Sequence, residues 1–200
     1  MICVGLSLRG CPVLVVAGPA AQRKILEYLS EGAFVTVCAL EKPEGFAPPD
    51  GARLLWRLEP YGAHLVPGMM LVHAATNDAA LNEQIVKDAR RFGVLSASMT
   101  ACGAASVRSM AAFETPELCV AVSTKGASPA LAASFAKTTA QTLSAEWESR
   151  LALLRRARTC VKEHCPPGAM RTALLRSLDQ APEHCLLQMA QSGEESAQTR

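Results

Sequence analysis

The stretch Pro12–Lys24 carries residue types that can hold a dinucleotide. It reads PVLVVAGPAAQRK, an apolar strand that runs into a turn of small residues and then into a helix. A complete dinucleotide fingerprint, G-x-G-x-x-G, uses its glycines for the tight turn, for close approach of the pyrophosphate and for helix–strand packing. Only Gly18 is present here, and Pro19 has no N–H group to offer an anion. The architecture is therefore easier to predict than the activity.

Further candidate residues follow the predicted strands, at the edge where ligands bind in an open α/β sheet. The small residues Gly18, Ala20 and Ala21 allow close approach of a cofactor, and the helix N-terminus favours its negative charge. Glu41 follows the second strand, where an acid can accept the ribose hydroxyls of NAD. Thr76 follows the fourth strand. These features predict a dinucleotide site, and a turn that has lost its ligand is the alternative.

Four titratable residues have a structural interpretation beside a functional one. Asp78 stands where it can cap the next helix, and we favour that role over catalysis. His73 lies inside an apolar strand and is expected to be a hydrogen-bonded core histidine rather than an acid–base group. Arg108 and Lys125 can meet a polyanionic substrate, and a solvated surface position fits them equally well.

The eight cysteines do not have the spacing of a disulfide scaffold. Four of them lie in apolar, strand-like surroundings, where thiols pack as small hydrophobes: Cys3, Cys11, Cys38 and Cys119. A later cluster comprises Cys160, His164, Cys165, His184 and Cys185. This cluster contains no C-x-x-C pair and matches no common zinc spacing, so we expect reduced cysteines on helices and no resident metal.

Strands and helices alternate as far as residue 98. We expect strands at Pro12–Val16, Phe34–Ala39, Arg53–Arg57, Met69–Ala75 and Val94–Ser98, and helices at Ala20–Ser30 and Ala79–Phe92. Gly32 and Gly93 close the two helices, and Lys42–Gly51 forms a loop. The alternation predicts an open, doubly wound parallel sheet of the α/β class.

The pattern changes after residue 98. Two β-segments, Ser106–Phe113 and Glu117–Ser123, are joined by a turn at Thr115-Pro116. A long helix starts with Ser128 as N-cap and continues, with or without a break, to about Glu163. A short helix is expected near Ala169–Leu178, followed at the end of the chain by a disordered polar tail.

Composition excludes several classes of protein. The chain has 200 residues, half of them hydrophobic, and a formal net charge of only +2, which gives no electrostatic reason to expect nucleic acid or a membrane surface as a partner. No apolar run reaches membrane-spanning length. The first twelve residues lack the order of a signal peptide, which points to the cytoplasm.

The motifs resemble those of a known family, the precorrin-2 dehydrogenase/sirohydrochlorin ferrochelatase module that also forms the N-terminal part of siroheme synthase. The resemblance covers roughly residues 2 to 180 and rests on four segments: Val13–Val16 leading to Arg23-Lys24, Ala33–Ala39, Ala74–Asp78 with Leu81-Asn82, and Ala121–Pro129. The last two are the more specific, because strand–A-A-T-[DN]-D and S-[ST]-x-G-x-S-P recur at this separation in the family.

The resemblance implies a homodimer that oxidises precorrin-2 to sirohydrochlorin with NAD as cofactor. It implies a Rossmann-like NAD-binding domain over residues 1–105, a β/α dimerisation and substrate region over 106–145 and a helical C-terminal domain over 146–190. The polar composition of the end of the chain predicts a disordered tail over 191–200. Cofactor contacts would fall on Gly18, Ala20, Ala21, Leu40, Glu41 and Thr76, and substrate carboxylates on Arg108, Lys125 and Ser128.

Two departures from the family pattern bear on activity. The glycine-rich turn is one residue shorter, and the family's aspartate after the fifth strand falls on Thr100. A threonine hydroxyl is a poor general base at neutral pH. The first hypothesis is therefore an NAD-dependent precorrin-2 dehydrogenase without the ferrochelatase step. The alternatives are a bifunctional enzyme that also takes Fe²⁺ or Co²⁺ as substrate, with Asp78 or Glu114 as the acid, and a non-catalytic tetrapyrrole-binding protein.

Overall fold

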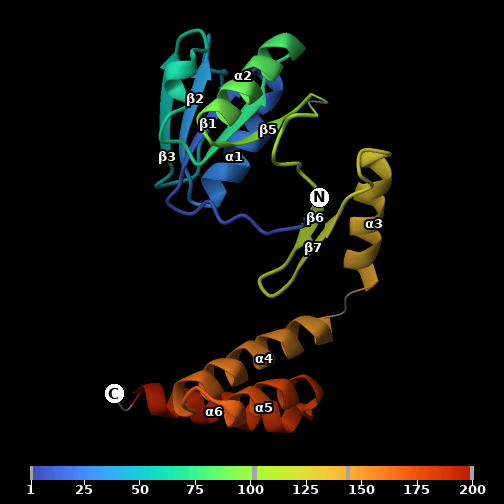
Figure 1. Ribbon diagram of the computed structural model, residues 1–200. Helices are drawn as coiled ribbons and strands as arrows, with labels where there is room; N and C mark the ends of the chain where they lie inside the picture. The colour runs from blue at the N-terminus through green and yellow to red at the C-terminus, as the bar shows by residue number, and fades with distance from the viewer. Residues whose placement is uncertain (1, 101–102, 143–144, 199–200) are drawn as a thin grey trace. The chain divides into compact units, whose positions relative to one another are not determined.

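The computed structural model describes residues 2–100, 103–142 and 145–198 (Figure 1). The chain divides into two compact units, Met1–Ser109 and Met110–Arg200. The dividing point lies four residues beyond the boundary expected at residue 105. The further division of the second unit near residue 145 stays a prediction.

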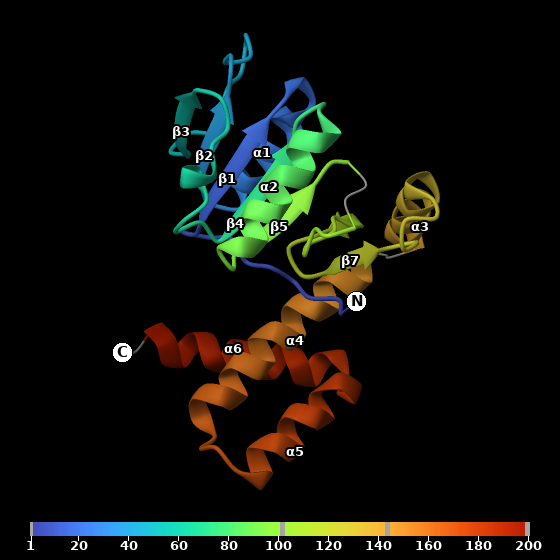
Figure 2. The same ribbon diagram turned by 45° about the horizontal axis from the view of Figure 1, so that its top comes forward.

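The first unit is built on a five-stranded parallel sheet with the strand order β3-β2-β1-β4-β5 (Figure 2). The strands are β1 (Pro12–Ala17), β2 (Phe34–Ala39), β3 (Arg53–Leu58), β4 (Leu71–Ala75) and β5 (Leu95–Ser98). From β1 the chain moves outward to β2 and β3, then returns to place β4 on the other side of β1. The reversal of strand order between β1 and β4 is the topological switch point of the sheet, where ligands bind in folds of this type.

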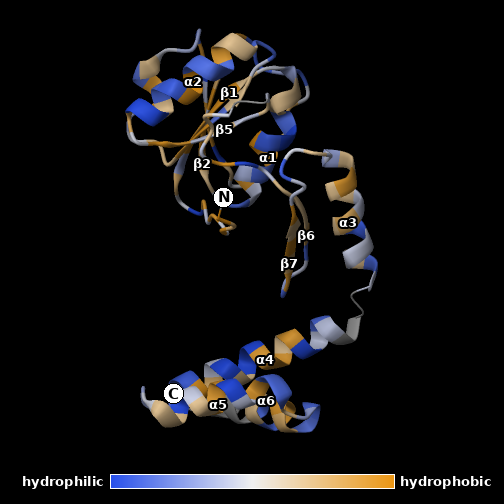
Figure 3. Cartoon of the chain, turned by 45° about the vertical axis from the view of Figure 1, so that its right-hand side comes forward, coloured by the Kyte–Doolittle hydropathy of each residue, from blue (hydrophilic) through white to orange (hydrophobic). Residues whose placement is uncertain are grey.

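Two helices cover opposite faces of this sheet. The buried side chains of β1 alternate, so that Val13 and Val15 pack with α1 (Gln22–Ser30), whereas Leu14 and Val16 pack with α2 (Ala79–Arg91). Both faces of the central strands are therefore buried, which explains why almost all of their residues are apolar (Figure 3). The predicted α/β class and parallel sheet are confirmed.

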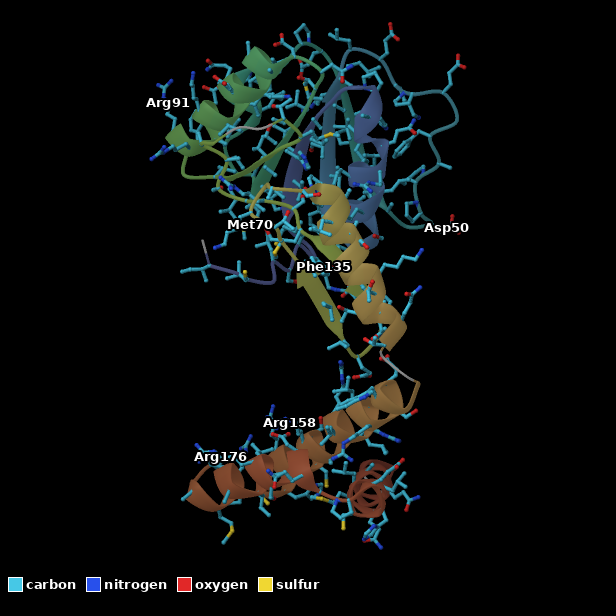
Figure 4. All side chains as sticks on the ribbon, turned by 90° about the vertical axis from the view of Figure 1, so that its right-hand side faces the viewer. Asp50, Met70, Arg91, Phe135, Arg158 and Arg176 are labelled. Carbon is cyan, nitrogen blue, oxygen red and sulfur yellow. The ribbon has the colours of Figure 1, made fainter. Side chains whose placement is uncertain are left out.

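The second unit combines a β-hairpin with helices. Strands β6 (Ala111–Glu114) and β7 (Cys119–Val122) pair antiparallel, and α3 (Pro129–Thr142) packs on them. Helices α4 (Ala145–His164), α5 (Ala169–Ser177) and α6 (Glu183–Gln198) share a core of buried residues: Leu153, Ala157, Val161, Leu178, Leu186 and Ala190. In Figure 4, Arg158 marks α4, and its guanidinium donates to the Leu175 carbonyl of α5 at 3.2 Å.

Several boundaries differ from the sequence predictions. The first helix begins as a 3-10 turn, Pro19–Ala21, and is α-helical only from Gln22. The two β-segments are shorter than expected, although the turn between them forms as predicted, with the Thr115 amide donating to the Leu118 carbonyl. Helix α6 was not predicted, and the expectation of a disordered tail from residue 191 is wrong as far as Gln198, because the helix that buries Leu186 and Ala190 continues to that residue. Residues 199–200 lie outside the described residues.

Candidate functional site

The candidate site lies at the switch point, where β1 and β4 end side by side. The register pairs Ala17 with Ala75, so that Gly18 and Thr76 follow at the same edge. The Gly18 amide donates to the Ala75 carbonyl at 2.8 Å. A Cβ atom on residue 18 would lie 3.1 Å from the Ala75 oxygen and 3.2 Å from the Thr76 Cα. Residue 18 is therefore a glycine because two turns of the backbone pass each other closely there.

The turn after Gly18 leads directly into the N-terminus of α1. Pro19 supplies no donor, and the Ala21 amide donates to the Gly18 carbonyl at 3.1 Å. Ala20 is exposed and Ala21 is buried. The first turn of α1 holds no acidic residue, so no side-chain carboxylate neutralises the positive end of the helix dipole there. This end of α1 favours a negatively charged group, although with fewer backbone donors than a glycine-rich turn would provide.

A hydrogen-bonded network joins the ends of β4 and β5. The side chain of Asn82 on α2 is fully buried; its Oδ1 accepts from the Thr76 amide (3.1 Å) and from the Thr76 hydroxyl (2.8 Å). Its Nδ2 donates to the Thr76 carbonyl (2.9 Å) and to the Thr100 Oγ1 (3.3 Å). Thr100 also contacts the Ser98 hydroxyl at 3.1 Å. The structure thus brings Thr76 and Thr100 together through one amide side chain.

Exposed apolar side chains border this edge. Leu40, directly after β2, is 74% exposed, and Met99, directly after β5, is 49% exposed. Glu41 is exposed beside Leu40. Large apolar groups at the ligand edge of a sheet are suited to cover the flat face of a nucleotide ring. The predicted contact of Glu41 with ribose hydroxyls stays a prediction.

His73 lies in the core, as predicted. It is 2% exposed on β4, and its Nδ1 is 2.7 Å from the Tyr28 hydroxyl of α1. Burial, helped by the nearby Lys24 and partly opposed by Glu27, lowers the pKa of His73 to about 4. The imidazole is therefore neutral at physiological pH and buried away from the edge, so we assign it no acid–base role.

Comparison with known proteins places this geometry in a family. A family described as putative NAD(P)-binding matches residues 4–107, which include the whole parallel sheet. The chain belongs to this NAD(P)-binding family. The fold also resembles the structure of a protein named SirC, precorrin-2 dehydrogenase, with a TM-score of 0.70 and 22% identity over 98% of this chain and 100% of that one.

Curated relatives of this chain are named siroheme synthase. The protein from Methylococcus capsulatus is 34% identical over 129 residues, which cover 64% of this chain and 27% of the relative. The protein from Escherichia coli O17:K52:H18 is 34% identical over 125 residues, which cover 62% of this chain and 27% of the relative. The chain thus spans little more than a quarter of these relatives. The resemblance indicated by the motifs is confirmed at the level of family and fold.

Asp78 caps α2, as predicted. Its Oδ1 accepts from the backbone amides of Ala80 (2.9 Å) and Leu81 (3.2 Å). Because this carboxylate satisfies two amides of the first turn of α2, the structure supports the capping interpretation over a catalytic one.

Replacing Asp78 by alanine is expected to lower the free energy of unfolding by about 1 kcal/mol, because two amides of the first turn lose their acceptor. Urea denaturation followed by circular dichroism measures the effect. Asp78→Asn is the matched control, since the amide oxygen keeps the cap. An equal loss of stability in both variants would contradict the capping role.

The predicted substrate contacts lie elsewhere in the chain. Arg108 is exposed on the loop that follows β5, near the end of the first unit. Lys125 and Ser128 belong to the β7–α3 loop of the second unit, where Lys125 adopts a left-handed backbone (φ 56°) and Ser128 caps α3 through the Leu131 amide. Their roles toward substrate stay predictions.

The cysteines only partly match expectation. Cys38 is buried and Cys11 is half-buried, but Cys3 and Cys119 are exposed, so the prediction that these two pack as small hydrophobes is wrong. Cys160 and His164 contact each other one turn apart on α4, at 3.7 Å. In the part of the chain that the structure describes, no three His, Cys, Asp or Glu side chains are grouped to hold a metal ion, and no helix is long and apolar enough to span a membrane.

The residue that sequence reasoning missed is Asn82. It belongs to one of the family motifs, but the sequence assigns it no role. The signal was nevertheless present, because Asn82 shares the spacing of the buried residues Ile85, Val86 and Ala89, which form the core-facing stripe of α2. An amide on an otherwise apolar stripe needs partners, and those partners are Thr76 and Thr100.

Proposed function

We propose that this chain is a cytoplasmic, NAD-dependent precorrin-2 dehydrogenase that works as a homodimer in tetrapyrrole biosynthesis. The observation that carries the proposal is the switch-point edge, at which Gly18 and Thr76 meet in a sheet of the NAD(P)-binding family. We infer the substrate from the names of the relatives and of the similar structure.

The reaction removes two hydrogens from precorrin-2. NAD⁺, when bound, would supply the acceptor for the hydride, and the accompanying proton would be released as sirohydrochlorin forms. The residues of this chain bind and orient: Gly18 and the start of α1 receive the pyrophosphate, and Thr76 holds the turn beside it. Thr100 stands where the resemblance places an aspartate, and since its hydroxyl is a poor base we assign the proton to water. Arg108, Lys125 and Ser128 are proposed to contact substrate carboxylates.

We infer NAD rather than NADP as the cofactor because of Glu41. Its exposed carboxylate follows β2, where it can accept ribose hydroxyls and would repel a 2′-phosphate. We expect Glu41→Gln to lower the ratio of the NADP⁺ dissociation constant to the NAD⁺ dissociation constant about tenfold. Calorimetry measures both constants. The control is Glu44→Gln, an exposed carboxylate of the same loop, which should leave the ratio unchanged. An unchanged ratio in Glu41→Gln would remove the argument for NAD.

The proposed reaction is tested anaerobically with purified protein, precorrin-2 and NAD⁺. We expect NADH and sirohydrochlorin to form together at a rate that rises with protein concentration. Sirohydrochlorin formation that does not depend on NAD⁺ would refute the dehydrogenase and favour a tetrapyrrole-binding protein. Addition of Fe²⁺ or Co²⁺ tests the bifunctional alternative, in which Asp78 would act while its Oδ1 caps α2.

A further inference from the structure

The amide of Asn82 is bonded at every position that its chemistry allows. An asparagine side chain can accept two hydrogen bonds and donate two. Both acceptor positions are taken by the amide and hydroxyl of Thr76, and both donor positions by the Thr76 carbonyl and the Thr100 hydroxyl. The side chain is completely buried, so water does not compete for these bonds.

The orientation of this amide follows from its partners. The Thr76 N–H can only donate, so the atom facing it must be the oxygen of Asn82. The Thr76 carbonyl can only accept, so the atom facing it must be the nitrogen. The nitrogen is thereby fixed as the group that meets Thr100.

This orientation makes the Thr100 oxygen an acceptor. It accepts a hydrogen bond from Asn82, and either hydroxyl can be the donor in its contact with Ser98. Thr76 in turn packs against Gly18, because the Thr76 Cα lies 3.2 Å from where a Cβ of residue 18 would be. One buried amide therefore links the turn after β1, the turn after β4 and the end of β5.

We propose that Asn82 is a positioning residue, which couples the cofactor-side turn at Thr76 to the substrate-side hydroxyl of Thr100 and holds that hydroxyl in place by donating to its oxygen. This deepens the proposed function and rests on it for its catalytic consequence. The coupling itself is a property of the folded chain and can be measured without cofactor.

The first test uses the backbone amide of Thr76, which donates to Asn82, as a nuclear magnetic resonance probe. Thr100→Val keeps the shape of the side chain but removes the hydroxyl, and we expect it to move the Thr76 amide resonance by more than its linewidth. Thr100→Ser keeps the hydroxyl and should leave that resonance close to its original position. Equal shifts in the two variants, or no shift in either, would overturn the coupling.

The second test measures NAD⁺ affinity and turnover. Asn82→Leu is expected to raise the dissociation constant of NAD⁺ about tenfold, and adding Thr100→Val to it should have little further effect on the catalytic constant. In the parent protein, Thr100→Val alone should lower the catalytic constant severalfold. Thr100→Ser should restore the catalytic constant of the parent. Independent, additive effects of the two substitutions would contradict a coupled role.

A matched control separates positioning from stability. Tyr61 donates to Asp88 near the other end of α2, at 3.1 Å. Tyr61→Phe removes this bond and is expected to destabilise the unit without changing the Thr76 resonance or the affinity for NAD⁺. If the parent protein fails to bind NAD⁺, the proposed function falls, and the resonance comparison alone decides the role of Asn82. If the parent binds NAD⁺ but Thr100→Val and Thr100→Ser behave alike, only the inference on Asn82 falls.

Discussion

Replacing Gly18 by valine is expected to weaken binding of the dinucleotide strongly and to destabilise the first unit. The added Cβ would meet the Ala75 oxygen at 3.1 Å and the Thr76 Cα at 3.2 Å, both of which are backbone atoms that cannot rotate away. The two methyl groups of valine extend further still. The β4–α2 turn must therefore move, which costs about 1–3 kcal/mol of unfolding free energy and displaces Thr76 from the site.

We expect the dissociation constant of NAD⁺ to rise at least tenfold in Gly18→Val. Calorimetry measures the affinity and urea denaturation measures the stability. Gly5→Val is the matched control, because no atom lies within 4 Å of a Cβ built at that glycine, and it should change neither quantity. Gly18→Val protein that binds NAD⁺ as the parent does would show that the close approach of the two turns plays no part in binding.

The Gly18 contact explains which part of the site could be predicted from sequence. A lone glycine after an apolar strand predicts a tight passage of the backbone, whatever the ligand. The glycine contacts the backbone at Ala75 and Thr76, which are 57 and 58 residues further along the sequence. Only the pairing of β1 with β4 brings the two segments together. The local half of the contact was predictable, whereas the identity of the facing turn depends on strand order.

The same distinction separates the predicted elements from the missed ones. The central strands were predictable because Val13–Val16 is a continuous apolar run and Leu71–Ala75 is apolar except for His73, as burial on two faces favours. Helix α6 was missed because many of its residues are polar and its apolar contacts come through a few positions such as Leu186 and Ala190. Its packing partner is α4, a contact that local sequence does not reveal.

Asn82 shows why a site can be hidden inside a correctly predicted helix. The stripe of α2 predicts which face is buried, but not which backbone groups need hydrogen-bond partners at the end of β4. His73 is the opposite case: an apolar strand predicted a buried, partnered imidazole, and the structure supplies Tyr28 as the partner. Prediction succeeded where a single element sets the environment and failed where two distant elements set it together.

His73 leads to the second large expected effect, a loss of stability in mild acid. Its pKa is about 4 in the folded chain, against an ordinary value of 6.5, because burial disfavours the imidazolium ion. The unfolded chain therefore binds a proton that the folded chain excludes, and stability falls as the pH drops from about 7 toward 4. The difference in pKa corresponds to about 3 kcal/mol at the acid end of this window.

The neutral imidazole behind this effect shares a hydrogen bond with a neutral phenol. Burial raises the pKa of the Tyr28 hydroxyl above its ordinary value, so the hydroxyl remains protonated, and the tautomer of His73 decides which of the two groups donates. Protonation of the imidazole would leave a charge among the buried residues of β4 and α1. The acid sensitivity thus comes from one buried imidazole in the core of the first unit.

The measurement is the free energy of unfolding in urea at a series of pH values between 7 and 4. The double variant Tyr28→Phe/His73→Leu replaces both polar partners by apolar groups of similar shape, and we expect its stability to fall much less over this range than that of the parent. His64→Gln replaces an exposed histidine of the same unit and should keep the slope of the parent. If the free energy of unfolding of the double variant falls with decreasing pH as steeply as that of the parent, the titrating group lies elsewhere. If it falls much less steeply, the buried imidazole is the group that the folded state keeps neutral.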